Sequence, residues 1–182
     1  MQGKRSRPHA RQLGVTLIEV CATLAIISIL VGTAAPSFQE VMQRRALDGA
    51  AAELASDLHF ARSEAVARQE GVRFAVQPAG GGSCVLIHTG ANGDCQCAGD
   101  GSAQCSNGAS LVKTTFYPST SRVSVAANVS AIRFEPHNGI ATPAGTVTVT
   151  TPSGHALRHV VNIMGRVRTC SPGATSMSAK PC

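Results

Sequence analysis

The hydrophobic pattern changes character twice along the chain. Residues 15–36 form an apolar segment that opens "VTLIEVCATLAIISILV" and carries one charge, Glu19. Residues 37–71 repeat apolar or small residues at spacings of three and four, which is the period of a helix with one buried face. Residues 72–182 alternate apolar and polar positions between Gly- and Pro-containing breaks, which is typical of antiparallel strands. The pattern predicts an α+β protein in which a long N-terminal helix packs on antiparallel β-sheets.

The first segment is long enough to cross a membrane. As a helix that rises about 1.5 Å per residue, residues 15–35 would span the roughly 30 Å hydrocarbon core. Four basic residues precede the segment and none lies within it. The positive-inside rule then places residues 1–14 in the cytoplasm and the chain after Pro36 outside it.

Glu19 is unusual inside such a segment. A carboxylate costs about 2.5 to 3.5 kcal/mol at the centre of a lone membrane helix and less near its end. This cost argues against a secretory signal peptide that is cut near Ala34 and Ala35. It predicts a positive partner for Glu19, supplied by another chain or by a newly made N-terminus.

The amphipathic segment predicts one buried helix face, formed by Leu47, Ala51, Leu54, Leu58, Ala61 and Ala65. Gly71 is a plausible stop for this helix. His59 and Arg62 lie off the stripe, so we expect them to be solvated and to have no function.

The residues "G-V-T-L-I-E-V" after the basic leader resemble the prepilin processing site of type IV pilins and type II secretion pseudopilins. The resemblance implies that a prepilin peptidase of the inner membrane cuts after Gly14 and methylates Val15. It also implies that Glu19 pairs with an N-terminal amine during assembly with other pilin subunits, and that the helix kinks at Pro36. Major pilins usually have phenylalanine in place of Val15, so this residue favours a minor subunit.

The order of elements beyond the leader also resembles the GspH and FimT branch of the pilin-like proteins. This resemblance implies an inner-membrane protein with a periplasmic C-terminal domain, which reaches the pilus or the cell surface after assembly. The resulting organisation is a leader over 1–14, a membrane and assembly helix over 15–36, its amphipathic continuation over 37–71 and a β-rich domain over 72–182.

Six of the seven cysteines lie in the β-rich region and are candidates for disulfides, because they are even in number and extracytoplasmic: Cys84, Cys95, Cys97, Cys105, Cys170 and Cys182. Their pairing is open, although Cys170 with Cys182 would close the C-terminal tail. Zinc binding by the first four is the alternative, but "C-Q-C" lacks the usual two-residue gap. Cys21 is read as a small apolar residue in the membrane segment.

No group of residues predicts an enzyme, a cofactor or a metal site. The sequence has no G-x-S-x-G and no H-E-x-x-H motif, and "GGGS" at residues 80–83 lacks the lysine and the following helix of a phosphate-binding loop. His155 and His159 would lie about 13 Å apart along a strand, too far to share one ion.

Positive charge is concentrated at the C-terminal end. The formal net charge of +6 includes four basic residues of the leader, and after Gly14 twelve basic residues face ten acidic ones, a net charge of +2. Residues 122–182 hold six basic residues against Glu135 alone, a net charge of +5. Such a concentration would attract a polyanion.

Arg166 and Arg168 are the sharpest candidates within this region. A spacing of two in an extended segment puts both guanidinium groups on the same side, about 6.6 Å apart along the chain. Each group offers a fork of donors that suits phosphate oxygens. Gly165 would let the backbone turn or approach a ligand closely. By itself this short pattern also fits a solvated turn.

The C-terminal stretch "GHALRHVVNIMGRVRTC" resembles the signature of FimT minor pilins, in which a G-R-x-R motif and a tail bind DNA during natural transformation. Carried over, the motif is Gly165, Arg166, Val167 and Arg168. Arg158 and Lys180 join it as candidates because of their charge and nearness in sequence.

The implied function is non-specific binding of double-stranded DNA, since one tyrosine, five phenylalanines and no tryptophan leave little for base stacking. The alternatives are a minor pseudopilin of a type II secretion system and a pilus-assembly subunit, both structural and without DNA binding. The basic C-terminal third is the only feature of the sequence that favours DNA binding over these structural functions.

Overall fold

The computed structural model describes residues 14–173 and 179–182. The basic leader apart from Gly14 lies outside the described residues, as does the side chain of Pro36, where a kink was expected. The chain divides into two compact units, Met1–Glu40 and Val41–Cys182. The helix α1, Leu17–Arg68, contributes to both units, and each unit is described by itself.

In the first unit, α1 exposes large apolar side chains on all sides. These include Leu17, Ile18, Leu24, Ile29 and Leu30. The most apolar 18-residue window of this helix has a mean hydropathy of 2.2 and is 0% buried within the protein. The segment is long and apolar enough to cross a membrane, and its bare apolar surface fits membrane anchoring.

In the second unit, the six residues of the expected helix stripe are all buried: Leu47, Ala51, Leu54, Leu58, Ala61 and Ala65. The helix ends before Gly71, which was expected to stop it. Instead, Gln69 takes a left-handed conformation with φ 55°, and Glu70 N–H donates to the carbonyl of Ala65. This is the hydrogen-bond pattern of a Schellman cap, with glutamine in the usual place of glycine.

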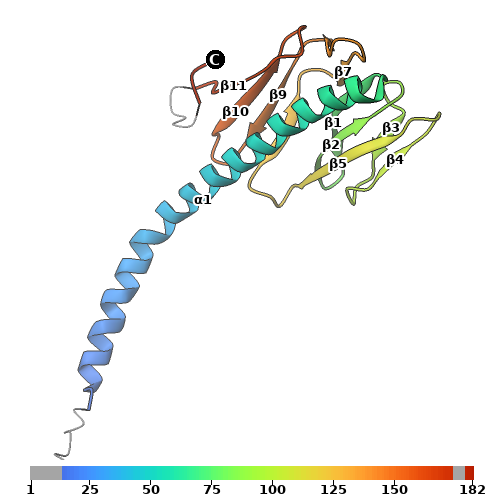
Figure 1. The fold of residues 1–182 in the computed structure, drawn as a ribbon. Coiled ribbons are helices and arrows are strands. Elements are labelled where there is room, and N and C mark those ends of the chain that lie inside the picture. The colour runs from blue at the N-terminus through green and yellow to red at the C-terminus, as the bar shows by residue number, and fades with distance from the viewer. Residues whose placement is uncertain (1–13, 174–178) are drawn as a thin grey trace, which may run out of the picture. The chain divides into compact units, whose positions relative to one another are not determined.

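Two antiparallel sheets flank this part of α1. One has the strand order β5-β2-β1-β7-β8, with β1 Val72–Ala79, β2 Gly82–His88, β5 Leu111–Pro118, β7 Ala131–Phe134 and β8 Ala141–Thr142. The other has the order β11-β10-β9-β6, with β6 Ser124–Ala127, β9 Gly145–Thr150, β10 Ala156–Val161 and β11 Val167–Cys170. Figure 1 shows β9, β10 and β11 on one side of the helix and β1, β2 and β5 on the other.

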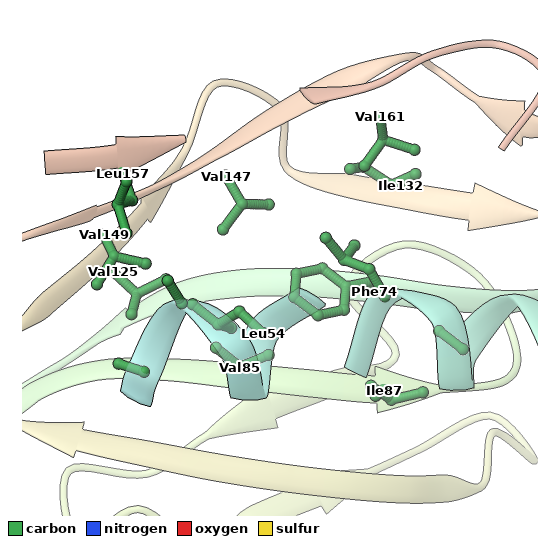
Figure 2. Packing of buried hydrophobic residues seen from close by; sticks show 14 of the residues in the cluster. Leu54, Phe74, Val85, Ile87, Val125, Ile132, Val147, Val149, Leu157 and Val161 are labelled. Carbon is green, nitrogen blue, oxygen red and sulfur yellow. The ribbon is translucent and has the colours of Figure 1, made fainter. Parts of the chain in front are cut away.

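Both sheets and the helix share one hydrophobic core. Figure 2 shows Leu54 and Phe74 between the valines of β9 and the side chains of Val85 and Ile87. Along β9 and β10 every second residue is buried, and the residues between them are more exposed. The inner face of the four-stranded sheet therefore packs on the core, and its outer face is open to solvent.

The structure pairs the six cysteines of this unit as Cys84–Cys97, Cys95–Cys105 and Cys170–Cys182. The first ties the small ribbon of β3, Cys95–Cys97, and β4, Ala103–Cys105, to β2, and the second joins the two strands of the ribbon to each other. The third closes the C-terminal tail. The four cysteines considered for zinc are thus all in disulfides. The exposed Cys21 is a free cysteine.

Candidate nucleic-acid interface

The two candidate arginines lie on the hairpin that joins β10 to β11, which we call the arginine hairpin, residues 160–168. Val161 pairs with Val167, and the turn between them closes through three bonds. Gly165 N–H donates to the carbonyl of Asn162 at 2.9 Å, Asn162 N–H to the carbonyl of Arg166 at 3.1 Å, and Arg166 N–H to Asn162 Oδ1 at 3.0 Å. Arg166 therefore ends the turn, and Arg168 lies within the edge strand β11.

Both arginines are exposed and line the same hollow, together with Val160, Asn162 and Val167. Val167 packs its side chain against the core. Because side chains alternate along extended backbone, this inward residue directs its two neighbours outward. The core thus sets the direction of both guanidinium groups.

Arg158 and Lys180 lie on the two segments next to the edge strand β11. Arg158 is exposed and pairs with Cys170 across the two strands, so it is a diagonal neighbour of Arg168 at about 7 to 8 Å. Lys180 is exposed, and its carbonyl accepts a bond of 2.9 Å from the backbone N–H of Ser171, the residue that follows β11. The four predicted basic residues therefore belong to adjacent segments of the fold.

The acidic side chain of the C-terminal third does not neutralise this edge. Glu135 forms an ion pair with Arg133, whose guanidinium group packs over Gly71. Within the residues that the structure describes, Arg158, Arg166, Arg168 and Lys180 form no ion pair. The basic group is smaller than the count over residues 122–182 suggested, because Arg133 is engaged elsewhere.

Gly165 supplies the backbone turn, which was one of the two roles expected of it. It is buried, its φ is +69°, and a Cβ built on it would lie 2.1 Å from the carbonyl oxygen of Gly139. Its close approach in this structure is to the β7–β8 turn. The residue serves the candidate interface by shaping the turn.

Arg62 was expected to be solvated, and this expectation is wrong. Its side chain is half-buried, and its Nε–H donates to the carbonyl of Gly139 at 3.1 Å. The Nε atom also lies 3.1 Å from the position of a Cβ on Gly165. Helical periodicity gave no signal for this contact, because the two partners are 77 positions apart in sequence. His59 is exposed, as expected.

His159 faces the inner side of the sheet and is fully buried. Its Nδ1 lies 2.9 Å from Thr169 Oγ1, and its Nε2 has no hydrogen-bond partner among the described residues. Burial lowers the pKa of His159, and the nearby backbone of Ala51 opposes this shift only in part. The neutral imidazole adds no charge to the arginine side of the sheet.

A second polar cluster joins α1 to β5. Lys113 Nζ lies 2.6 Å from Asp57 Oδ1, and the hydroxyl of Tyr117 donates to Glu53 Oε2 at 3.1 Å. Burial, followed by the charge of Glu53, raises the pKa of Tyr117 well above its ordinary value. These contacts pin the helix to the five-stranded sheet. Among the described residues, no three His, Cys, Asp or Glu side chains gather as a metal site.

Comparison with known proteins agrees with this architecture. Residues 50–165 match the sequence model of the family "Type II transport protein GspH". No curated protein sequence matches the chain. The structure is similar to that of the type IV minor pilin FimU of Pseudomonas aeruginosa in two crystal forms. The identities are 20% and 18%, the TM-score is 0.50 for both, and the match covers 69% and 68% of this chain and 88% and 91% of FimU.

These structural likenesses show the fold: a long N-terminal helix with antiparallel sheets, as in pilins. The minor pseudopilin EpsH of Vibrio cholerae is a further similar structure, with 14% identity, a TM-score of 0.44 and coverage of 70% of this chain and 98% of EpsH. The family match spans more than half of the sequence and includes α1 from residue 50 and the strands up to the arginine hairpin. The chain therefore belongs to the GspH family of pilin-like proteins.

Proposed function

We propose that this protein is a minor type IV pilin of the FimT kind that binds double-stranded DNA without sequence preference, for DNA uptake in natural transformation. The observation that carries the proposal is the exposed pair of Arg166 and Arg168 on one hollow, without a carboxylate partner among the described residues. We propose that the protein acts by binding DNA and by assembling with other pilins, and not as a catalyst.

The chemistry of the arginine hairpin suits a phosphate backbone. Arginine binds phosphate oxygens through paired donors, and neighbouring contacts let one surface hold successive phosphates. The outer face of the adjoining strand β9 adds the hydroxyl-bearing side chains of Thr146, Thr148 and Thr150, which are residue types that also bond to phosphate. If about three phosphates are neutralised, the logarithm of the affinity falls with the logarithm of salt at a slope near −3.

Anchoring and assembly complete the proposed function. Gly14, Val15 and Thr16 are exposed and precede the first helical residue, Leu17, so a prepilin peptidase could reach the bond after Gly14. Cleavage there would create the amine that pairs with Glu19 when the subunit joins other pilins. We propose a single span of the inner membrane, with the leader cytoplasmic and the second unit periplasmic until assembly.

The test is DNA binding by the full-length chain in a neutral detergent, measured at several salt concentrations. Arg166→Gln with Arg168→Gln removes two charges from the hairpin. Arg45→Gln with Arg122→Gln is the matched control, since Arg45 is exposed on α1 and Arg122 precedes β6, at the opposite edge of the sheet. We expect the first variant to lose most of the affinity, at least tenfold, and the control to change it little.

Equal losses in the two variants would show that net charge, and not the hairpin, attracts the DNA. Absence of binding by the parent protein would refute the proposed function. Circular dichroism on each variant checks that the loss does not come from unfolding.

A structural subunit without DNA binding is the second candidate, because the matching family is described as a type II transport protein. In that case the variant of both hairpin arginines would assemble and function like the parent. Loss of transformation with normal pilus assembly would favour the DNA-binding function instead.

A further inference from the structure

We infer that Arg62 is the positioning residue of the arginine hairpin: its Nε–H holds the Gly139 carbonyl against which Gly165 packs, and so sets the orientation of Arg166. The inference rests on the proposed function, since it names what prepares the DNA-binding surface. It concerns a residue of α1 that the sequence pattern left without a role.

The hairpin turn makes two contacts with the segment that joins β7 to β8. Ala141 N–H, in β8, donates to the carbonyl of Ile163 at 3.0 Å. Gly165 lies so close to Gly139 that a Cβ would stand 2.1 Å from its carbonyl oxygen. The β7–β8 turn is therefore the support on which the arginine hairpin rests.

Arg62 fixes this support to the helix. Its Nε lies 3.1 Å from the Gly139 carbonyl oxygen, and a Cβ on Gly139 would stand 2.6 Å from the same Nε. Gly139 also has φ +64°, a conformation that other residues rarely adopt. The close fit of Arg62 thus requires glycine at both turns, and Arg62 joins α1, the β7–β8 turn and the hairpin.

The consequence for binding follows from preorganisation. Arg166 directly follows Gly165, so freedom in the turn becomes freedom in the direction of its guanidinium group. A binding surface that must be ordered on contact loses affinity relative to one already held in place. Without the Arg62 donor, the carbonyl of Gly139 loses a partner, and we expect the turn to loosen.

Two substitutions separate position from charge. The amide nitrogen of glutamine stands as many bonds from Cα as Nε of arginine does, so Arg62→Gln keeps a donor there and removes the charge. Lysine has a methylene at that point and its ammonium group one atom further, so Arg62→Lys keeps the charge and removes the donor. Arg62→Leu removes both.

The experiment uses the full-length chain in a neutral detergent and measures two quantities for the parent and each variant. The first is affinity for a duplex DNA over a range of salt. The second is hydrogen–deuterium exchange of peptides that cover residues 160–168, in the absence of DNA.

We expect Arg62→Gln to stay close to the parent in both measurements. For Arg62→Lys and Arg62→Leu we expect faster exchange in the hairpin and affinity about three- to tenfold weaker, the range that one lost hydrogen bond produces. The salt slope of Arg62→Lys should equal that of the parent, because the same phosphates are contacted.

The opposite ranking overturns the inference. If Arg62→Lys binds like the parent, and Arg62→Gln binds more weakly with a salt slope reduced by about 0.9, Arg62 is itself a phosphate contact. Unchanged exchange in both Arg62→Lys and Arg62→Leu also overturns it. Absence of DNA binding by the parent refutes the proposed function, whereas hairpin exchange still decides whether Arg62 holds the turn.

Discussion

Gly165 and Gly139 are two residues whose missing side chains shape the arginine hairpin. Both have positive φ, and each stands where a Cβ would collide with the other turn or with Arg62. The glycine of the G-R-x-R motif thus acts through packing inside the protein, while the arginines beside it face solvent. At the scale of single residues, a structural role and a proposed binding role divide within four consecutive positions.

Gly165→Ala tests this packing, and Gly154→Ala is its control. Gly154 also has a positive φ, +86°, but a Cβ on it would meet nothing within 4 Å. The control should lose only the cost of the left-handed conformation, about 1 to 2 kcal/mol. Gly165→Ala should lose a further 1 to 3 kcal/mol or so, because a backbone oxygen obstructs the methyl group. Chemical denaturation measures both, and equal losses would contradict the packing described.

The C-terminal tail shows how one covalent link can place a charge. The backbone N–H of Cys182 donates to the carbonyl of Ser171, and Cys182 is bonded to Cys170 at the end of β11. The carbonyl of Lys180 accepts a bond from the N–H of Ser171, so these contacts hold Lys180 next to β11, the strand that carries Arg168. At the scale of elements, the disulfide extends the basic edge by one residue.

Cys170→Ser with Cys182→Ser is expected to release Lys180 from this edge. If Lys180 contacts a phosphate, the salt slope of DNA binding becomes less negative by about 0.9. The loss of stability should stay near or below about 3 kcal/mol, since the closed loop is short.

The matched control is Cys95→Ser with Cys105→Ser, which removes a disulfide of similar span from the β3–β4 ribbon. We expect this variant to lose stability and keep the parental salt slope. The same slope in all three proteins would show that the tail makes no contact with DNA.

The main hydrophobic core of the second unit is shared by α1 and both sheets. His159 belongs to that core: the hollow beside it is lined by Asp48, Ala51 and Ala52 from the helix and by Thr169 from β11. Its Nδ1 lies 2.9 Å from the hydroxyl of Thr169, and Asp48, whose carboxyl is the other ionisable group lining this hollow, is exposed. Protonation of His159 would therefore place a charge in the core of the unit.

Stability of this unit should fall as the pH drops below the ordinary histidine value of 6.5. The pKa of His159 is lowered in the folded state, so the unfolded chain takes up a proton first, and proton uptake favours unfolding. Hydrogen bonds hold the pKa of Asp94 and of Asp100 below the ordinary value of 3.8, so their contributions are lost only in stronger acid.

Denaturation at pH 7.5 and pH 5.5 checks this expectation. In His159→Asn, which can keep a polar contact with Thr169, the difference between the two pH values should be smaller than in the parent. An unchanged difference would show that another group causes the acid sensitivity.

Much of this architecture could be predicted from local patterns. The spacing of Leu47, Leu54 and Leu58 predicted the buried helix face, because neighbours three and four apart share a side of any helix. Alternation predicted antiparallel strands, and the processing motif with the β-rich order predicted a pilin-like family. The even number of cysteines predicted disulfides, and the "R-x-R" spacing predicted two arginines on one side. Each of these properties is set by residues close together in sequence.

What only the tertiary structure decided depends on residues far apart in sequence. The partners of Cys84 and Cys97 follow from how β2 meets the β3–β4 ribbon. Arg62 had no recognisable pattern, since its partner Gly139 is brought near only when helix and sheets close on a common core. The periodicity of a sequence predicts which face of a helix or strand is buried. It does not predict which backbone group that face contacts, because this contact forms only when the elements pack together.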